Sequence, residues 1–372
     1  MARIVIVGAG LAGLSCALLL NRNGYEVTVI EKNDFPFHKV CGEYISNEVL
    51  PYLQSFGIDV HELYPSKLTR LKITSLSGRQ LSVPLDLGGV GLSRFKYDNL
   101  LYEHALRSGI IFKTRTKVHS IQFRDNEFEV LSGGSEVISC DLVIGAFGKR
   151  SNLDQKLKRS FFYRRSPFMA VKYHLAAQFD EDLIELDLFR GGYSGICKIE
   201  EEMYSLCYLL NNDVLRRHQT IAEVERRVLF ENESIRRHFK EGQIIGRARV
   251  INEISFERKP VVEGHILCCG DAAGMISPFC GNGMAMAIHA GKILGECISR
   301  HLAKDRWLVR RDLLEQNYRR EWNAQFLLRL GTGRVIQKTF LHPFLTEVCL
   351  TSLRALPLLG RRVLKKTHGN PF

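Results

Sequence analysis

Several common sequence features are absent from this 372-residue chain. No apolar run reaches the roughly 20 residues that a membrane-spanning helix needs, and no secretory signal, transit peptide, internal repeat or low-complexity segment is visible. The ten cysteines form no CxxC pair and follow no regular spacing, which argues against a disulfide framework. The adjacent Cys268 and Cys269 have no candidate ligands nearby in sequence, so we predict a strand there and no bound metal. These absences predict a cytoplasmic protein with reduced, buried cysteines.

Charge is distributed unevenly along the chain. The net charge is +12, and the residues from His301 onward contain 14 Lys and Arg against five Asp and Glu. Nine of the twelve excess positive charges therefore lie in the last fifth of the chain. A basic face of this kind can meet an anionic membrane or an acidic substrate, or it can simply be solvated. We predict no nucleic-acid partner.

The first residues predict a nucleotide-binding βαβ unit. Residues 4–7 are a β-branched apolar run typical of a strand buried in a parallel sheet. Gly8, Gly10 and Gly13 follow at the spacing that supplies a tight turn, close approach of the backbone to a pyrophosphate, and close packing of helix on strand. The helix predicted over 11–23 would point its first N–H groups at the phosphates.

An acidic residue completes this unit. The second strand, predicted over Glu26–Ile30, delivers Glu31 18 residues after Gly13. A carboxylate there accepts hydrogen bonds from ribose hydroxyls and repels a 2′-phosphate. The nucleotide is therefore predicted to be FAD or NAD rather than NADP.

The middle of the chain predicts further strands and helices with approximate bounds. The predicted strands are 68–75, 80–84, 110–113, 117–123, 128–131, 135–140, 142–145, 169–175, 183–189 and 203–209. The predicted helices are 46–57, 96–107 and 221–230. Two glycine-rich stretches are predicted to be irregular, 88–91 as a flexible passage and 191–195 as a turn.

A second glycine-rich block lies near residue 280. The strand predicted over 265–269 ends at Asp271, and Gly281 and Gly283 precede a helix predicted over 284–298. An aspartate at the carboxyl end of a strand can accept from hydroxyls, and the helix N-terminus favours negative charge. Two such sites in one chain predict a single long ligand, and a dinucleotide with a polyol arm fits better than a nicotinamide cofactor.

Together these motifs resemble a known flavoprotein family. Gly8-x-Gly10-x-x-Gly13 with Glu31, Arg94 at the head of a helix, and the block from Gly270-Asp271-Ala272-Ala273 to Gly281-Asn282-Gly283 look like the para-hydroxybenzoate hydroxylase type. The segment Lys39-Val40-Cys41-Gly42-Glu43 is most similar to the geranylgeranyl reductase branch. The resemblance covers residues 1 to about 300, and its most specific part is the second block.

The resemblance implies FAD as the cofactor and assigns residues to it. The pyrophosphate, the adenosine ribose, the adenine, the ribityl chain and the flavin ring would each be met by a part of this set. The implied cofactor-binding residues are Gly8, Gly10, Leu11, Ala12, Gly13, Glu31, Lys32, Cys41, Gly42, Arg94, Val118, Asp271, Gly281, Gly283 and Met284. A fixed cation such as Arg94 suits the phosphate charges, and backbone N–H groups at 283–284 suit the reduced flavin.

One position departs from the family pattern. These flavoproteins usually carry an Asp-Gly pair after the strand that corresponds to 142–145, where this chain has Phe147-Gly148. The replaced carboxylate is linked to pyridine nucleotide contacts in the hydroxylases. The departure argues against direct use of NADPH but not against flavin binding, and NAD(P)H and an electron-donor protein both stay candidate donors.

The expected fold class is α/β. The resemblance implies a Rossmann-type FAD-binding domain of the glutathione-reductase-like kind, with an inserted α+β substrate domain and a C-terminal helical segment. In residue numbers, the FAD-binding domain is expected over 1–66, 92–155 and 257–300, the substrate domain over 67–91 and 156–256, and the basic helical segment over 301–372.

Three functions remain open at this stage. The resemblance implies either reduction of C=C bonds in an isoprenoid or polyketide chain, or oxygen-dependent hydroxylation of an alkylated phenol or quinone precursor. A flavin-binding adaptor without turnover is the third. Cys41, Glu43 and Tyr44 are the candidate catalytic residues, as proton donors or orienting groups beside the flavin.

The end of the sequence bears on where a lipophilic substrate is met. Residues 341–359 are rich in Leu, Phe, Val and Pro, and a basic cluster follows over 361–366. Apolar residues beside cations are typical of a helix that lies on an anionic membrane. This pattern predicts peripheral contact with the inner face of the membrane, although a core-packing helix with a basic end explains the same residues.

Overall fold

One half of the molecule is built on a six-stranded sheet. The computed structural model describes residues 2–302, 310–355 and 367–372. The strand order is β16-β17-β10-β1-β2-β6, and every neighbouring pair is parallel except β16 with β17. The strands are β1 (Arg3–Val7), β2 (Glu26–Ile30), β6 (Ile111–Lys113), β10 (Leu142–Gly145), β16 (Val262–Glu263) and β17 (Ile266–Cys268). Segments far apart in sequence therefore end at one edge of this sheet.

The predicted βαβ unit forms as expected. Helix α1 (Leu11–Arg22) follows β1 directly, and β2 returns parallel to β1. Gly8 adopts a φ of 106°, and a Cβ on it would lie 2.4 Å from the carbonyl oxygen of Ala146. A Cβ on Gly13 would lie 2.1 Å from the carbonyl oxygen of Gly8. Both positions therefore require glycine, one for the turn and one for the close helix packing.

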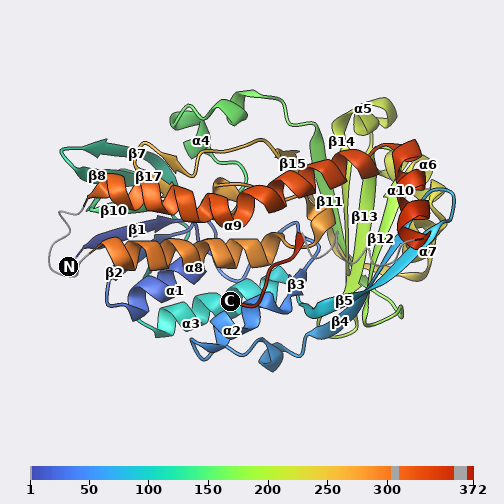
Figure 1. The fold of residues 1–372 in the computed structure, drawn as a ribbon, viewed down its shortest axis with the longest axis horizontal. Coiled ribbons are helices and arrows are strands. Elements are labelled where there is room, and N and C mark those ends of the chain that lie inside the picture. Colours follow the sequence, from blue (N-terminus) through green and yellow to red (C-terminus); the bar gives the residue numbers. More distant parts are fainter. Residues whose placement is uncertain (1, 303–309, 356–366) are drawn as a thin grey trace.

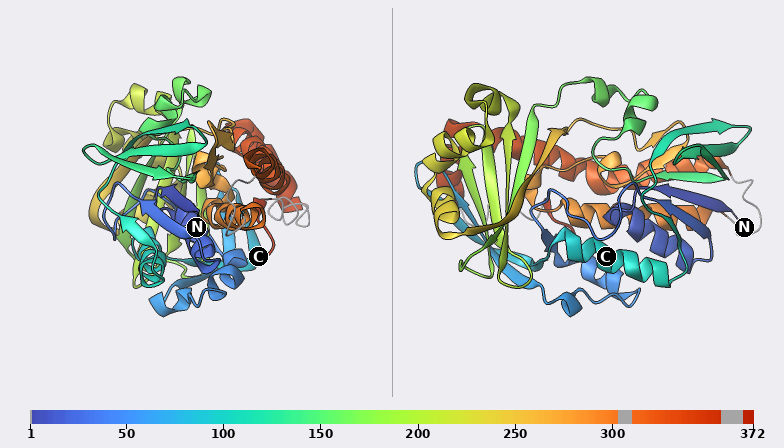
Figure 2. Two further views of the ribbon diagram at one scale, coloured as in Figure 1. Left: turned by 90° about the vertical axis from the view of Figure 1, so that its left-hand side faces the viewer. Right: turned by 180° about the vertical axis from the view of Figure 1, so that it is seen from behind.

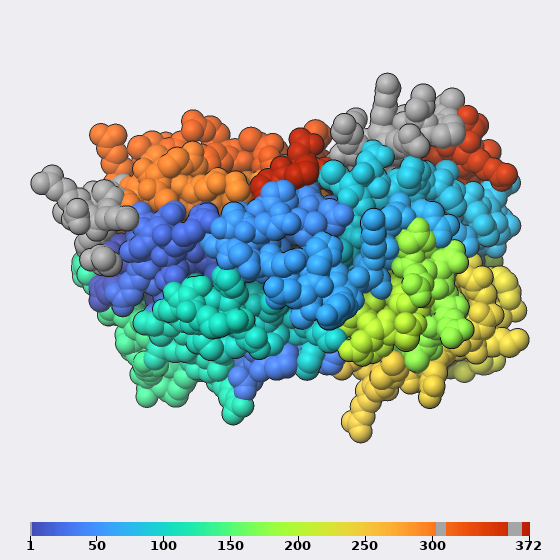
Figure 3. Space-filling view, turned by 90° about the horizontal axis from the view of Figure 1, so that it is seen from below, coloured from blue at the N-terminus to red at the C-terminus, as the bar shows by residue number. Residues whose placement is uncertain are grey.

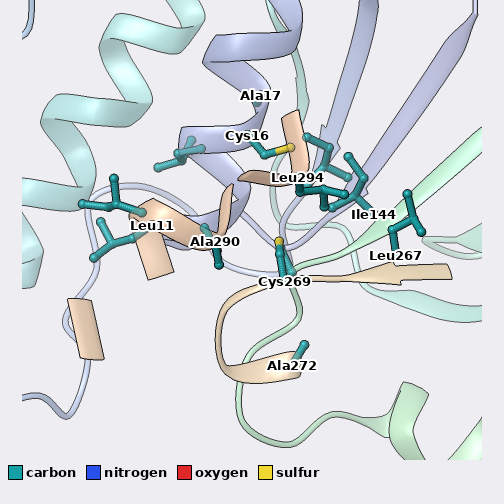
Figure 4. Packing of buried hydrophobic residues seen from close by; sticks show 14 of the residues in the cluster. Leu11, Cys16, Ala17, Ile144, Leu267, Cys269, Ala272, Ala290 and Leu294 are labelled. Atoms are coloured by element: carbon teal, nitrogen blue, oxygen red, sulfur yellow. The ribbon is translucent and has the colours of Figure 1, made fainter. Parts of the chain in front are cut away.

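Helix α8 (Gly283–His301) packs tightly on α1. A Cβ on Gly291 would lie 2.5 Å from the carbonyl oxygen of Ala12, so the two backbones meet where small residues allow it. Figure 4 shows Cys16 of α1 and Cys269 beside Ala290 and Leu294 of α8 in this core. All ten cysteines of the chain are free thiols. Cys16 and Cys269 thus pack as small apolar side chains, as the sequence predicted.

The other half is built on an eight-stranded sheet of order β15-β11-β14-β13-β12-β4-β5-β3. Its strands are β3 (Tyr44–Ser46), β4 (Ser66–Thr74), β5 (Gln80–Gly91), β11 (Phe168–Ala176), β12 (Leu183–Phe189), β13 (Gly192–Lys198), β14 (Met203–Asn211) and β15 (Gln243–Ile254). This sheet stands at one end of the molecule (Figure 1), and helices cover its outer face (Figure 2). Those helices are α5 (Asn212–His218), α6 (Ile221–Arg227) and α7 (Glu233–Glu241).

Two glycine-rich stretches differ from the prediction. Residues 88–91 are the end of β5 and pair with both β3 and β4. A Cβ on Gly89 would lie 2.2 Å from the ring of Tyr44, so the glycine gives space to that ring. The turn predicted over 191–195 is correct only at Gly191, which has a φ of 83°; β13 begins at Gly192, where a Cβ would lie 2.2 Å from the carbonyl oxygen of Leu209. Close approach, not chain reversal, explains Gly89 and Gly192.

The remaining elements connect and cover the two sheets. A three-stranded meander consists of β7 (Val118–Arg124), β8 (Glu127–Ser132) and β9 (Glu136–Cys140). The short helices α2 (Leu50–Gln54) and α4 (Asn152–Lys156) and the longer α3 (Arg94–Arg107) complete the nucleotide half. The helix predicted over 46–57 is thus divided into strand residues, a 3₁₀ turn and the five-residue α2.

Two helices near the end of the chain bridge both halves. Helix α9 (Arg311–Phe340) runs along the molecule, and α10 (Pro343–Ala355) turns back at the end of the eight-stranded sheet (Figure 1). Seen from below, the yellow-green and yellow segments of the second half gather at that same end (Figure 3). Among residues 2–302, 310–355 and 367–372, no helix has the length and apolarity needed to cross a bilayer. The predicted basic cluster over 361–366 lies outside the described residues.

Candidate functional site

A large cavity lies between the two sheets. Its volume is about 1230 Å³, and its lining comes from both halves of the molecule. Cavities of this size at the junction of two structural units are the usual place for a cofactor and a substrate. Almost every residue that the sequence predicted for the site lines this cavity. They are Gly8, Gly10, Leu11, Ala12, Glu31, Lys32, Cys41, Gly42, Glu43, Tyr44, Arg94, Val118, Asp271, Gly281, Gly283 and Met284.

Gly13 is absent from that lining and has the packing role described above. Gly10 faces open space, because the nearest atom that a Cβ there would meet is Lys39 Nζ at 3.8 Å. The backbone of β1, the turn and α1 therefore presents N–H groups to the cavity without a side chain in the way. This is the geometry that binds a pyrophosphate.

Glu31 is held at the edge of this turn. Its Oε2 accepts a hydrogen bond from the backbone N–H of Ala9 at 3.0 Å, and its Oε1 accepts from the backbone and side chain of Asn33 at 3.0 and 2.9 Å. The side chain is buried. These bonds fix the carboxylate, and its remaining lone pairs can accept from ribose hydroxyls.

Two cations near the turn share one buried carboxylate. Arg94 donates from Nε and Nη2 to Asp98 at 2.6 and 2.7 Å, and Lys39 Nζ donates to Asp98 at 2.7 Å. Burial alone would raise the pKa of Asp98, but Arg94 and Lys39 lower it, so Asp98 stays ionised. Asp98 therefore fixes both cations in the cavity lining, where fixed positive charge suits phosphate groups.

Neither Lys39 nor Asp98 was predicted to be a cofactor-binding residue, although Lys39 begins the segment that resembles the geranylgeranyl reductase branch. The spacing of four residues between Arg94 and Asp98 on α3 was the available signal for Asp98. Nothing local in the sequence tied Lys39 to this helix, because the two are joined only through the fold.

Asp271 lines the cavity and lies near several cations. Burial raises the pKa of its carboxyl, and Lys259 counteracts that rise. Lys259 Nζ donates to the carbonyl oxygens of Asp271 and Lys149, both at 2.7 Å. Lys259 thus fixes the backbone that carries Asp271, and the carboxyl faces the cavity as an acceptor for hydroxyls.

The turn before α8 is shaped by a left-handed residue. Gly281 has a φ of 65°, and α8 begins at Gly283. Gly283 is unobstructed, because only Ile276 would lie within 4 Å of a Cβ there. The first N–H groups of α8, including that of Met284, therefore face the cavity and can stabilise negative charge on a bound ring.

The last described residues return to this turn. Asn282 Nδ2 donates to the carbonyl oxygen of Thr367 at 2.9 Å, and the Phe372 ring stacks on His289 of α8 with 3.9 Å between centroids. The N–H of Phe372 donates to the carbonyl oxygen of Glu48 at 3.2 Å. His368 consequently lines the cavity, a contribution for which the sequence gave no indication.

Cys41 lines the cavity where the two halves of the molecule meet. Its sulfur accepts from the N–H of Glu43 at 3.4 Å, and the residue is partly exposed. The carbonyl oxygen of the neighbouring Gly42 accepts from the thiol of Cys197 on β13 at 3.4 Å. Cys41 is therefore a cavity-facing thiol on a loop that is anchored to the eight-stranded sheet, and its catalytic role stays a prediction.

Glu43 is completely buried and binds three partners. Its carboxylate forms an ion pair with Lys172, lies 2.8 Å from His174 Nε2, and accepts from the backbone N–H of Arg94 at 2.8 Å. Burial opposes ionisation, but His174 and Lys172 lower the pKa of Glu43 below its ordinary value. Glu43 adopts a φ of 62°. This geometry favours a positioning role for Glu43, which joins the Cys41 loop, α3 and β11.

Tyr44 forms part of the cavity wall. Its hydroxyl donates to the carbonyl oxygen of Gly88 at 3.4 Å, and burial raises the pKa of the phenol. A phenol with a raised pKa stays protonated at neutral pH and can orient a ligand by hydrogen bonding. Tyr44 thus remains a candidate orienting group.

The part of the cavity beneath the eight-stranded sheet is strongly apolar. Side chains alternate along these strands, so that one set faces the cavity and the other faces α5–α7. The cavity-facing side chains include Leu71, Leu85, Ala170, Ile184, Leu186, Tyr193, Cys197, Cys207, Leu209, Ile251 and Ile254. Phe279 closes this part and packs edge-on against Tyr193 with 5.0 Å between centroids.

Phe147 also lines the cavity, at the end of β10. Val118 lies at the start of β7, where its carbonyl oxygen accepts from Asn152 Nδ2 at 3.1 Å. The backbone at Val118 is therefore fixed beside the cavity, as a contact to a purine ring requires. Phe147 thus lies at the cavity in place of the carboxylate that the resemblance to the hydroxylases implies.

Comparison with known proteins decides the family. The family model described as FAD binding domain matches residues 1–309. The chain belongs to this FAD-binding family. It is an FAD-dependent oxidoreductase, and the predicted α/β fold with a Rossmann-type FAD-binding domain is confirmed.

Relatives differ in what they do. The chain is 24% identical over 388 residues to a digeranylgeranylglycerophospholipid reductase of Methanosarcina acetivorans, covering 96% of this chain and 91% of that protein. It is 23% identical over 328 residues to a 1H-pyrrole-2-carbonyl-[peptidyl-carrier protein] brominase of Pseudoalteromonas luteoviolacea, covering 82% and 79%. The structure of the flavin-dependent brominase Bmp2 matches with a TM-score of 0.80 at 19% identity, covering 98% and 93%. The predicted resemblance to the geranylgeranyl reductase branch is confirmed.

The cavity fits FAD along its whole length. The unobstructed backbone at Gly10 and the cations Lys39 and Arg94 would hold the pyrophosphate, and Glu31 would hold the adenosine ribose. Asp271 would accept from the ribityl hydroxyls, and the first turn of α8 would meet the flavin ring. FAD would then occupy the polar half of the cavity and leave the apolar half for a substrate.

Proposed function

We propose that this protein reduces C=C bonds in an isoprenoid or polyketide chain. The observation that carries the proposal is the apolar half of the cavity, which lies beneath β11–β14 and opens onto the Cys41-Gly42 loop. A polar substrate would lose its hydration against those walls without finding hydrogen-bond partners, whereas a prenyl chain would bury apolar surface against them. The relationship to the archaeal lipid reductase supports the same substrate class.

Reduced FAD supplies the hydride for such a reduction. The apolar walls orient the double bond and exclude water, and Phe279 with Tyr193 closes the far side. When reduced FAD is bound and supplies the hydride to one carbon of the double bond, Cys41 Sγ would supply the proton to the other. The thiol would regain its proton from solvent, and Glu43 would keep the loop in place through Lys172 and His174.

A second candidate function follows from a specific observation. The brominase relative and the fold match to Bmp2 cover most of the chain, and the motifs that resemble the hydroxylases belong equally to oxygen-dependent enzymes. Hydroxylation or halogenation of an electron-rich aromatic ring therefore stands as the alternative. A flavin-binding adaptor without turnover would have the same FAD-binding residues.

The donor of electrons is part of the proposal. Phe147 removes the carboxylate expected beside a pyridine nucleotide, so we propose an electron-donor protein in preference to direct NAD(P)H. Stopped-flow reduction of the bound flavin by NADH and NADPH tests this preference. Reduction by either nucleotide at a rate that exceeds turnover would contradict it.

The deciding experiment separates the reaction classes. The FAD-loaded protein is reduced anaerobically with dithionite and mixed with geranylgeraniol, or with a geranylgeranyl glycerophospholipid in detergent. Anaerobic flavin reoxidation and a product with two added hydrogens support the reductase. Reoxidation that requires oxygen, with a hydroxylated phenol or a bromide-dependent brominated pyrrole as product, supports the alternative. If neither substrate class reoxidises the flavin and yields a product, the result supports the adaptor.

A further inference from the structure

The corner formed by α9 and α10 is apolar on its inner face. The ring of Phe340, at the end of α9, stacks on Phe279 with 4.5 Å between centroids. Phe279 in turn lines the apolar half of the cavity. Ile336, Leu350 and Leu353 belong to the same hydrophobic cluster, which also contains the cavity residues of β4 and β12. The corner is thus the wall between this half of the cavity and the outside.

The same corner is apolar on its outer face. Leu328 and Val335 are 72% and 65% exposed on α9, and Phe344 and Val348 are 70% and 47% exposed on α10. Positions 328 and 335 are seven residues apart and 344 and 348 are four apart, so each pair shares a helix face. We call these four residues the outer face. Exposed apolar side chains that share a helix face mark a candidate interaction site.

Charge identifies the kind of partner. Lys338 and Arg354 are exposed beside the outer face. The acidic residue of α10, Glu347, forms an ion pair with Arg79 and a 2.8 Å hydrogen bond with Ser77, so its charge is compensated. The corner therefore combines exposed apolar side chains with positive charge. This combination is the one that binds an anionic bilayer surface.

We propose that the outer face of α9 and α10 docks on an anionic membrane and that a lipid chain passes from there to the apolar half of the cavity. The docking step stands on the outer face alone. The passage of a lipid chain rests on the proposed function. A second copy of the protein is the competing occupant, and the cations at the corner disfavour it because two such faces would repel each other.

Vesicle co-sedimentation of the full-length, FAD-loaded protein tests docking. The probes are vesicles of equal parts phosphatidylglycerol and phosphatidylcholine, and vesicles of phosphatidylcholine alone. The variant Leu328→Gln with Phe344→Gln removes two outer-face side chains, and Ile111→Gln with Val137→Gln is the matched control at exposed apolar positions elsewhere. We expect binding to the anionic vesicles to fall roughly tenfold in the outer-face variant and to be unchanged in the control.

Three results would overturn docking. They are absence of the wild type from the anionic vesicle pellet, an equal loss in the control, or a dimer by light scattering that the outer-face variant dissociates. Lys338→Gln with Arg354→Gln should weaken binding to anionic vesicles only. Flavin reoxidation by a short prenyl alcohol in detergent, without vesicles, reports on the proposed function separately. Docking without flavin reoxidation would contradict the passage of a lipid chain and would still support docking on the membrane.

Discussion

The two halves of the cavity are built on opposite physical grounds. The FAD half is a set of charged groups whose orientation is fixed by buried partners, as Asp98 fixes Arg94 and Lys39. The substrate half is a smooth apolar surface made from alternating positions of Ile184, Leu186 and their neighbours. Specific polar geometry demands particular residues at particular spacings, whereas an apolar wall can be made in many ways. An FAD site of fixed geometry can therefore be combined with apolar walls of different shapes.

Removing the shared carboxylate of the FAD half should have the largest effect. Asp98→Asn leaves Arg94 and Lys39 buried without a counter-charge, and we expect a loss of about 3–5 kcal/mol in the free energy of unfolding. FAD content should fall with it. Chemical denaturation and the flavin absorbance of the purified protein measure both. Glu103→Gln, on an exposed ion pair of the same helix, is the control and should cost under about 1 kcal/mol.

Breaking the Glu43 connection should be nearly as costly. Glu43→Gln leaves Lys172 buried and unpaired, and we expect a loss of about 3 kcal/mol. If the loss comes from leaving Lys172 unpaired, the double variant Glu43→Gln with Lys172→Met should recover much of the lost free energy of unfolding. A double-mutant cycle by thermal and chemical unfolding measures the coupling. Additive effects would mean that the two side chains act independently.

A change in the substrate half should leave FAD binding intact. Ala170→Phe projects a ring from β11 into the apolar cavity, and we expect kcat/KM for a prenyl substrate to fall roughly tenfold or more. The FAD content should match that of the wild type. Ala170→Cys, which adds one atom, is the control. Loss of FAD in Ala170→Phe would show that the two halves are not separable in this way.

The smallest effect is expected at Asp187, on the side of the eight-stranded sheet that α5–α7 cover. Burial, and then Glu185, raise the pKa of Asp187 to about 7, while His238 lies 3.5 Å from it. Because this folded-state pKa exceeds the ordinary value of 3.8, its contribution to stability is complete below pH 3.8 and is lost as pH rises through 7. Asp187→Asn should remove about 1 kcal/mol of the decline in stability between about pH 6 and 8. Unfolding curves at several pH values measure this decline, and an unchanged slope would contradict it.

The βαβ unit could be predicted because its signals are local. Gly8, Gly13 and Glu31 follow one another within a single βαβ unit, so their spacing carries the geometry. The partners of Glu43 could not be predicted, because Lys172 and His174 reach it from a strand about 130 residues away. The same limit applies to the glycines of β5 and β13, whose need for glycine comes from rings and carbonyls of other strands.

The substrate half showed only as a series of strands at regular spacing. Alternation along each strand predicted pairing but not which face would meet the cofactor. Leu186 and Asp187, adjacent in β12, lie on opposite faces of the sheet, one in the cavity and one beside α7. Register with neighbouring strands decides this assignment, and register is a property of the assembled sheet.

The return of residues 367–372 to the N-terminal turn of α8 has a practical consequence. Phe372 stacks on His289, and Thr367 accepts from Asn282 in the turn that lines the cavity. An affinity tag fused directly after Phe372 would therefore pull on the flavin side of the cavity, whereas Arg3 opens β1 at the far end of the molecule from the eight-stranded sheet (Figure 1). Preparations tagged at opposite ends should differ in flavin occupancy before any residue of the site is changed.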